Sequence, residues 1–378
     1  MGFIITNSPY QHISFGVVVL PLIWLYVIYN YEKYFTRKSK YYVFAFLILS
    51  FYFSYVALFD NFGYGKGTLF DISLFFIFVC MPAYERKKTF EYFFDFGTVL
   101  LFLSIIEYIL FVVFGVGLIL DTFDRGEMAA KESLYMQGLF NYYCLDSIDL
   151  MRFQSLFREP GYLGQCAGLV LILWGRVNLK KILVWLIAGI MSMSLFFYVF
   201  CFIVACYHLM IKKNTNLSAV ANKIKTFLVI VLICTVSFYF IPNEYKDILQ
   251  SRIETIQETK TDNRSTAELN FALEKMFKEG NVTGYGATSF YKNNMNEKNT
   301  GLKADLYILG VLGVIIILIC YNMVLAGTPS SNKNKYLCFL FFIVLYYNAD
   351  VKYELYVHLL LFEIFLNQNC LFYGKVSY

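Results

Sequence analysis

Residues 152–174 read RFQSLFREPGYLGQCAGLVLILW, which places two arginines and a glutamate directly before an apolar run. The apolar part has the composition of a membrane-spanning helix. Charged side chains at the edge of hydrocarbon are costly, and those found there commonly serve a function. The sequence therefore raises the question of what Arg152, Arg158 and Glu159 bind.

The composition of the whole chain agrees with a membrane protein. Of its 378 residues 58% are hydrophobic and 16% are charged, whereas soluble domains are about 45–50% apolar and about 25% charged. We expect one integral membrane domain over residues 1–378, without a cleavable signal peptide. The nine cysteines form no CxxC pair and mostly lie in apolar runs, which predicts small core residues rather than disulfides or metal ligands.

About eleven transmembrane helices are predicted, which makes the expected fold an all-α polytopic bundle. The apolar segments are 13–31, 41–59, 69–83, 93–120, 161–175, 182–195, 197–211, 224–241, 304–323, 336–348 and 354–369. The run 182–211 is too long for one upright helix, so we expect a turn at Ser192–Ser194. Segment 93–120 is long enough to hold a tilted helix with an interfacial end.

The distribution of Lys and Arg predicts the orientation of these helices. Basic residues are concentrated in connections 32–40, 84–91, 175–181, 212–225 and 327–335, which all fall on one side of the bundle. The alternate connections 121–160 and 242–303 hold most of the acidic residues. This pattern predicts an outer N-terminus, an inner C-terminus and two large outward-facing loops.

The second outer loop, 242–303, is expected to contain two amphipathic helices. Apolar residues recur at helical spacing at Leu249, Ile253 and Ile256. The second helix follows a capping-box pattern at Ser265–Glu268 and ends before Gly280. Its apolar face is predicted to consist of Leu269, Leu273, Met276 and Phe277.

The motif at residues 152–165, called the opening motif below, suits the binding of an anion that carries several oxygen atoms. Pro160 favours a helix start, which leaves free N–H groups and a positive dipole end at the outer side. Arg158 and Arg152 add positive charge, so a diphosphate is the most natural ligand. Glu159 would orient an arginine or accept a proton. The alternative is that both arginines contact lipid headgroups and that Glu159 pairs with one of them.

Further candidates lie in the second outer loop and at its end. Arg264 precedes the second amphipathic helix, and Gly284 and Gly286 permit a close backbone approach to a ligand. Lys303 and Asp305 stand at the entrance of the next predicted span, where an acid is a functional candidate. A plain loop turn and an interfacial Lys–Asp pair are the structural alternatives.

Four acidic residues inside or near the ends of the predicted spans, Asp71, Asp95, Glu107 and Glu363, would suit an ion path in a transporter. Their positions favour structural pairing. The three histidines are scattered, and no HExxH, DxD, Walker or nucleophile-elbow pattern occurs. We therefore expect neither a metal site nor a cofactor.

Together these motifs resemble a family. The pattern consists of Arg152, then Arg158-Glu159-Pro160-Gly161-x-x-Gly164, then Arg264, Gly284-Tyr285-Gly286, Asp305 and Leu309-Gly310-x-x-Gly313. It is similar to bacterial O-antigen and capsule repeat-unit polymerases of the Wzy type, which are related to O-antigen ligases. The resemblance covers about residues 150–315, and the hydropathy of the rest agrees with it.

The resemblance implies a GT-C-like glycosyltransferase in the bacterial inner membrane with a periplasmic active site for lipopolysaccharide biosynthesis. The donor would be a glycan linked through diphosphate to undecaprenyl, and the acceptor a lipid-linked repeat unit. Arg152, Arg158 and Arg264 would bind diphosphate, with Gly284, Gly286 and Lys303 as further substrate contacts. Glu159 or Asp305 would activate the acceptor hydroxyl. No metal is implied; a chain-length regulator and a flippase are the expected protein partners, and nucleic acid is not.

Three other functions remain open at this point: a ligase or another lipid-linked glycosyltransferase, a transporter or flippase, and a non-catalytic membrane scaffold. Ligases of this superfamily carry a histidine in the large periplasmic loop, and residues 242–303 contain none. This difference favours polymerase over ligase. A transporter or flippase would be expected to hold its functional charges near mid-membrane, whereas the best candidates here lie at the outer edge.

Overall fold

The computed structural model describes residues 24–34, 40–60, 62–117, 120–124, 134–144, 153–155, 157, 160–173, 177–211, 232, 267–293, 301–348 and 355–366. Residues 24–29 are helical and lead into α2 (Tyr31–Tyr34). The other helices are α3 (Lys40–Phe59), α4 (Phe62–Cys80), α5 (Ala83–Phe114), α6 (Pro160–Leu171), α7 (Leu179–Met191), α8 (Leu195–Ile211), α11 (Ala267–Lys278), α12 (Ala287–Lys292), α13 (Gly301–Gly327), α14 (Asn332–Asn348) and α15 (Leu355–Leu361), which continues as the π-helix η4 (Phe362–Leu366). The strands are β1 (Asp121–Asp124), β2 (Leu134–Gln137) and β3 (Tyr142–Cys144).

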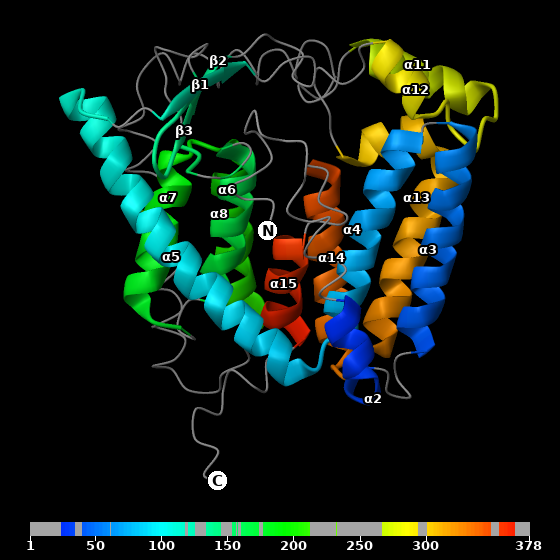
Figure 1. Cartoon of the computed structure of the whole chain (residues 1–378), viewed down its shortest axis with the longest axis horizontal. Coiled ribbons are helices and arrows are strands. Elements are labelled where there is room, and N and C mark those ends of the chain that lie inside the picture. Colours follow the sequence, from blue (N-terminus) through cyan, green and yellow to red (C-terminus); the bar gives the residue numbers. More distant parts are fainter. Residues whose placement is uncertain are drawn as a thin grey trace.

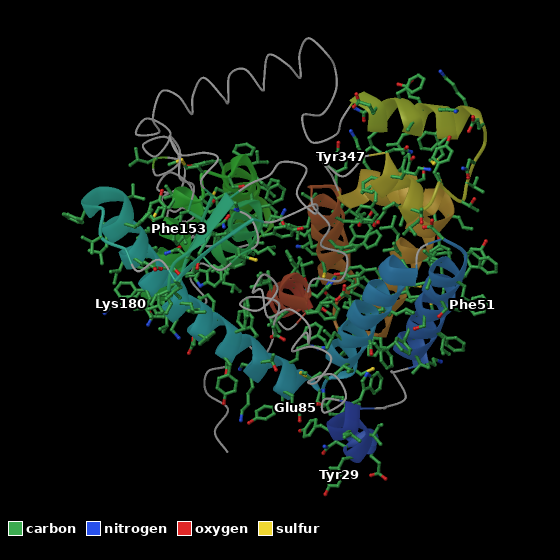
Figure 2. The ribbon with its side chains drawn as sticks, turned by 45° about the horizontal axis from the view of Figure 1, so that its top comes forward. Tyr29, Phe51, Glu85, Phe153, Lys180 and Tyr347 are labelled. Atoms are coloured by element: carbon green, nitrogen blue, oxygen red, sulfur yellow. The ribbon has the colours of Figure 1, made fainter. Side chains whose placement is uncertain are left out.

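Three of these helices are long and apolar enough to cross a membrane. They are α3, residues 83–112 of α5, and α13. Large apolar side chains on their outer faces are exposed, for example Phe51 of α3 at 81%, which points away from the bundle in Figure 2. Apolar side chains on such a face suit contact with lipid rather than water. The chain is accordingly a helical membrane protein.

The helices form two groups that lie side by side (Figure 1). In one group α3 packs against α4 and α13, and α14 packs against α13. In the other group α6 packs against α7 and α8, and α5 lies on α7. Between the groups, α15 contacts α4, α5, α6 and α14. The buried core is therefore continuous across the bundle.

Most predicted spans coincide with helices wherever the structure describes them. The predicted turn at Ser192–Ser194 is confirmed, because α7 ends at Met191 and α8 begins at Leu195. Met193 has a positive φ of 47°, and the Ser192 hydroxyl donates to Gly189 O at 2.6 Å. The predicted span 224–241 lies outside the described residues. The cysteines of the described part, Cys80, Cys166, Cys201, Cys320 and Cys338, are free and buried, as expected.

One predicted connection is wrong. Residues 84–91 are not a loop but the first turns of α5, which begins after Pro82 and has 32 residues. The basic and acidic residues there are good helix formers, and Lys87 and Glu91 pair at i, i+4. At 1.5 Å per residue α5 is about 48 Å long, which exceeds the hydrocarbon thickness. It crosses the bundle diagonally in Figure 1.

The described parts of the two predicted outer loops, which include β1–β3 and α11–α12, lie at the same end of the bundle in Figure 1. The expected helical bundle is observed, and the first of these loops adds a small sheet to it. β1, β2 and β3 form a small antiparallel sheet in that order, with Thr122 opposite Met136 and Met136 opposite Tyr143. Tyr, Phe, Met and Thr in short runs suit such strands, but apolar spans dominate a hydropathy pattern and hide them.

The second predicted amphipathic helix is confirmed as α11. Leu269, Leu273 and Met276 are buried, and the chain leaves the helix through Gly280 at a φ of 68°. Phe277 was expected on the buried face and is instead 56% exposed. Its position beside Met276 turns it to the rim of the apolar stripe. The first predicted amphipathic helix, built on Leu249, Ile253 and Ile256, lies outside the described residues.

Candidate functional site

The described residues at the start of the opening motif, 153–155 and 157, are buried and make several hydrogen bonds. Phe153 is fully buried, its ring centroid lies 5.4 Å from that of Tyr108 on α5, and its N–H donates to Met191 O of α7 at 3.3 Å. Ser155 adopts a positive φ of 52°, and its hydroxyl lies 2.7 Å from that of Ser104 on α5. The Ser104 hydroxyl in turn donates to Phe140 O at 2.8 Å. These contacts tie the segment before Arg158 to α5, α7 and the first outer loop.

Helix α6 begins at Pro160, as the sequence predicts. Its glycines allow α8 to approach closely: a Cβ at Gly164 would lie 2.6 Å from Ser194 Cβ, and one at Gly168 would lie 2.7 Å from the Phe200 ring. The second and third turns of α6 are therefore packed closely against α8 and the residue before it. Free N–H groups at the start of a helix favour an anion.

Glu107, one of the four acidic residues in the spans, holds the first outer loop onto α5. Its carboxylate accepts from Leu139 N at 2.6 Å, from Phe140 N at 2.8 Å and from Asn141 Nδ2 at 3.0 Å. A carboxylate with three donors is a strong local anchor. This arrangement is structural pairing rather than a step in an ion path.

Helix α13 is broken at Gly310, which has φ 67° and ψ −176°. The break frees carbonyl groups that residues 282–286 bind: Tyr285 N donates to Tyr307 O at 2.8 Å, and Gly286 N donates to Ile308 O at 3.1 Å. In return Leu312 N donates to Val282 O at 3.0 Å. The Gly284-Tyr285-Gly286 motif is thus docked on the break in α13.

Both sides of this contact need glycine. Gly284 has a positive φ of 79°, and a Cβ there would lie 2.5 Å from Gly310 N. A Cβ at Gly310 would lie 2.2 Å from Val282 O. The close approach that Gly284 was predicted to allow is made, in the structure, to the backbone of α13. Contact of Gly284 and Gly286 with a ligand stays a prediction.

Tyr52 and Gly313 complete the break. The Tyr52 hydroxyl donates to Leu309 O at 3.2 Å, and a Cβ at Gly313 would lie 2.5 Å from the Tyr52 oxygen. The spacing Leu309-Gly310-x-x-Gly313 therefore has a local physical reason, because Gly310 opens the helix and Gly313 admits the side chain that satisfies it.

A residue that the sequence reasoning missed is Asp60, which follows α3. Its carboxylate accepts from the backbone N–H groups of Ala287 and Thr288, at the start of α12, and Thr288 Oγ1 donates to Asp60 O at 2.9 Å. Asp60 thus acts as a non-local N-cap for a helix that begins after Gly286. The only sequence signal was an acid at the end of an apolar span.

Tyr285 extends the same contact outward. Its hydroxyl donates to Glu279 Oε2 at 2.8 Å. Partial burial raises the pKa of Tyr285 above its ordinary value, and the hydrogen bond to Glu279 adds to the rise. The hydroxyl is therefore protonated at neutral pH and bridges the 282–286 loop to the end of α11.

Lys303 and Asp305 occupy the first turns of α13 and face different partners. Lys303 Nζ donates to Asn270 Oδ1 on α11 at 3.2 Å. Asp305 is 1% exposed, and the Tyr346 hydroxyl of α14 donates to its Oδ2 at 2.5 Å. The alternative of an interfacial Lys303–Asp305 pair stays a prediction.

Two of the other acidic residues, Asp95 and Glu363, are also engaged. Asp95 pairs with Lys181 of α7. Glu363 lies in the π-helix η4, fully buried, with Arg86 Nε 3.7 Å from its Oε1, and the Arg86 guanidinium stacks over Phe362. A buried charged pair of this kind links the start of α5 to the end of α15. Asp71 is exposed on α4.

Four predicted site residues, Arg152, Arg158, Glu159 and Arg264, lie outside the described residues. The described residues nearest to them in the sequence are Phe153–Ser155, Phe157 and the start of α6 on one side and α11 on the other. Within the described part of the chain, no three His, Cys, Asp or Glu side chains are grouped to hold a metal ion.

Comparison of the chain with family models, with curated proteins and with solved structures finds no match in any of the three.

Proposed function

We propose that this protein is a repeat-unit polymerase of the Wzy type. In this proposal it joins undecaprenyl-diphosphate-linked oligosaccharides into polysaccharide at the periplasmic face of the bacterial inner membrane. The full bundle of about eleven transmembrane helices and its GT-C-like character belong to the same proposal. The observation that carries it is the start of α6 at Pro160, directly after Arg158 and Glu159, at the end of the bundle that bears both outer loops.

The proposed reaction is a glycosyl transfer. The acceptor hydroxyl oxygen attacks the anomeric carbon of the donor, the bond from that carbon to the diphosphate oxygen breaks, and the hydroxyl proton passes to a base. Arg152, Arg158 and Arg264 would stabilise the charge that develops on the departing lipid diphosphate. The positive end of α6 would act on the same oxygen atoms.

Two carboxylates are candidates for the base. Asp305 is buried and already accepts a hydrogen bond from Tyr346. A general base must reach the proton that it removes, so this burial favours Glu159, which precedes the first turn of α6. Asp305 would then serve to hold α13 and α14 in register beside the break at Gly310.

The test is the glycan ladder of a deletion strain that carries the variants. Arg158→Ala is expected to insert normally but to leave lipid cores capped with one repeat. The matched control is Lys180→Ala, which removes a cation at the start of α7, in one of the predicted inner connections, and should give the full ladder. A full ladder from Arg158→Ala would refute the proposed role of the arginine.

The deletion strain also separates the alternatives. Single-repeat product indicates a polymerase, free core with accumulated lipid-linked polymer indicates a ligase, and accumulation on the cytoplasmic side indicates a flippase. Cysteine labelling at position 264 tests the orientation, since a cytoplasmic location there would contradict the predicted topology.

A further inference from the structure

The loop between α11 and α12 exposes apolar side chains at the outer end of the bundle. Val282 is 57% exposed, and Phe277, in the last turn of α11, is 56% exposed. The backbones of these two residues lie close together, because each neighbours one end of the hydrogen bond from Asn281 N to Met276 O at 3.0 Å. Figure 1 shows α11 and α12 at the ends of α3 and α13. The depth of this loop decides whether water or lipid covers the two side chains.

Helix α13 gives a first measure of that depth. Val282 O accepts from Leu312 N at 3.0 Å, so the two residues lie at the same level. From Leu312 the helix continues without a further break to its inner end at Gly327, a distance of about 22 Å at 1.5 Å per residue. The hydrocarbon layer is about 30 Å thick. Val282 therefore lies inside the outer part of that layer or at its edge.

Helix α3 gives a second and independent measure. Its 20 residues form one of the candidate membrane spans, and their length of about 30 Å equals the hydrocarbon thickness. Asp60 follows this helix directly and accepts from the N–H groups of Ala287 and Thr288 at the start of α12. The start of α12 is thus held at the level where α3 leaves the hydrocarbon layer. Both helices place the loop at the outer boundary of the layer.

The exposed face of α13 reaches the same loop. Leu312, Ile315 and Ile319 are exposed and recur at i, i+3 and i+7, so they form one face of the helix. The hydrogen bond from Leu312 N places Val282 beside the outer end of this face. An apolar surface that continues the lipid-facing side of a spanning helix suits acyl chains rather than water.

We propose that Phe277 and Val282 contact the outer boundary of the lipid bilayer and anchor the loop after α11 to the membrane. The partner is the region in which acyl chains meet the headgroups. Interfacial helices bind there by burying aromatic and aliphatic side chains. This contact is an attachment of the loop in addition to Asp60 and the break in α13. It does not depend on the reaction proposed above.

Phe271 shows that exposure alone does not define this surface. Phe271 is 70% exposed and lies on the same helix, α11. It follows the buried Leu269 by two residues and precedes the buried Leu273 by two, and two residues turn a helix by about 200°. The side chain therefore points away from the bundle and into water. It is a matched control for Phe277.

The experiment measures fluorescence quenching by brominated lipids. The whole chain is held in nanodiscs of phosphatidylethanolamine and phosphatidylglycerol, and Val282→Trp and Phe277→Trp each add one indole to the three native tryptophans. Both positions are exposed, so the larger side chain displaces no packed neighbour. Bromine close to the headgroup should reduce the added emission strongly, and bromine near the end of the acyl chain should reduce it less.

Two further variants calibrate the depth. Phe271→Trp should keep its added emission with either brominated lipid, because the indole lies in water. Ile319→Trp, near the middle of the hydrocarbon layer on the lipid-facing side of α13, should show the reverse order of quenching by the two lipids.

The outcomes decide the inference. Absence of quenching at either 277 or 282, beside quenching at 319, would overturn it. Equal quenching at 271 and 282 would overturn it too, since the two faces would then not differ. A blue-shifted but unquenched emission at 282 would show that protein rather than lipid covers the loop. The glycan ladder is a separate measurement: a ladder that contradicts the polymerase leaves the lipid contact intact, and a failed lipid contact leaves the polymerase proposal intact.

Discussion

The replacement Gly284→Ala tests how the outer loop is held on α13. Gly284 has a φ of 79°, and a Cβ there would lie 2.5 Å from Gly310 N and 2.7 Å from the carbonyl oxygens of Tyr307 and Ile308. These are backbone atoms, which cannot move aside as the end of a flexible side chain can. The loop is therefore expected to leave its site on α13 in this variant.

The magnitude follows from the contacts that are lost. A non-glycine residue at a left-handed φ costs about 1–2 kcal/mol. Undocking also breaks the hydrogen bonds from Tyr285 N, Gly286 N and Leu312 N, each of which contributes about 0.5–1.5 kcal/mol. Together these figures give at most about 2.5–6.5 kcal/mol of local destabilisation.

Gly280→Ala is the matched control. Gly280 has a similar φ of 68°, but a Cβ there meets nothing within 4 Å. The control therefore carries the backbone strain without the clash. The difference between the variants, about 1.5–4.5 kcal/mol, corresponds to a roughly 10- to 10³-fold larger increase in opening for Gly284→Ala.

Hydrogen–deuterium exchange of the amides of Tyr285, Gly286 and Leu312, in protein held in nanodiscs, measures this opening directly. Faster exchange at these amides in Gly284→Ala than in Gly280→Ala is the expected result. Equal protection in the two variants would show that the glycine is not required for the docking, and the account of the break at Gly310 would be refuted.

Three further predictions follow from the same end of the bundle. Tyr346→Phe removes the donor to Asp305 Oδ2 and should cost about 1.5–3 kcal/mol; an unchanged unfolding midpoint in detergent would contradict it. Glu107→Gln weakens the anchor of Leu139 N and Phe140 N, so limited proteolysis within 138–141 should become faster, and wild-type cleavage rates would refute this. Because the pKa of Tyr285 is raised in the folded protein, its contribution to docking is complete below pH 10 and is lost as the pH rises through the raised pKa. In Tyr285→Phe, the protection of the Gly286 amide from hydrogen exchange should not fall in this way as the pH rises. The same alkaline fall in protection as in wild type would contradict the prediction.

Much of the framework was accessible to short-range patterns in the chain. Apolar runs located α3–α8 and α13–α15 within a few residues at most ends, and Pro160 marked the start of α6. The serine-rich turn divided α7 from α8. These signals depend on neighbouring residues alone, because hydropathy, capping and φ preferences act over one or two helical turns. The same reasoning erred at 84–91, where charge indicated a loop and helix propensity prevailed.

The candidate site was accessible only in part. The glycines at 284, 286, 310 and 313 were visible as motifs, but their purpose was not. The carbonyl groups freed at Gly310 are bound by residues about 25 positions earlier and by Tyr52, and a pattern in one segment does not show which distant segment meets it.

The charged residues show the same division. Hydropathy alone indicated that burying the carboxylates of Glu107, Asp305 and Glu363 lowers stability. In the tertiary structure each carboxylate has a partner from another part of the chain. Glu107 binds the first outer loop, Asp305 binds Tyr346, and Glu363 lies beside Arg86. The partner of a buried charge is chosen by packing between distant helices. Local sequence therefore established the helices, and only the folded chain established what the described motifs hold together.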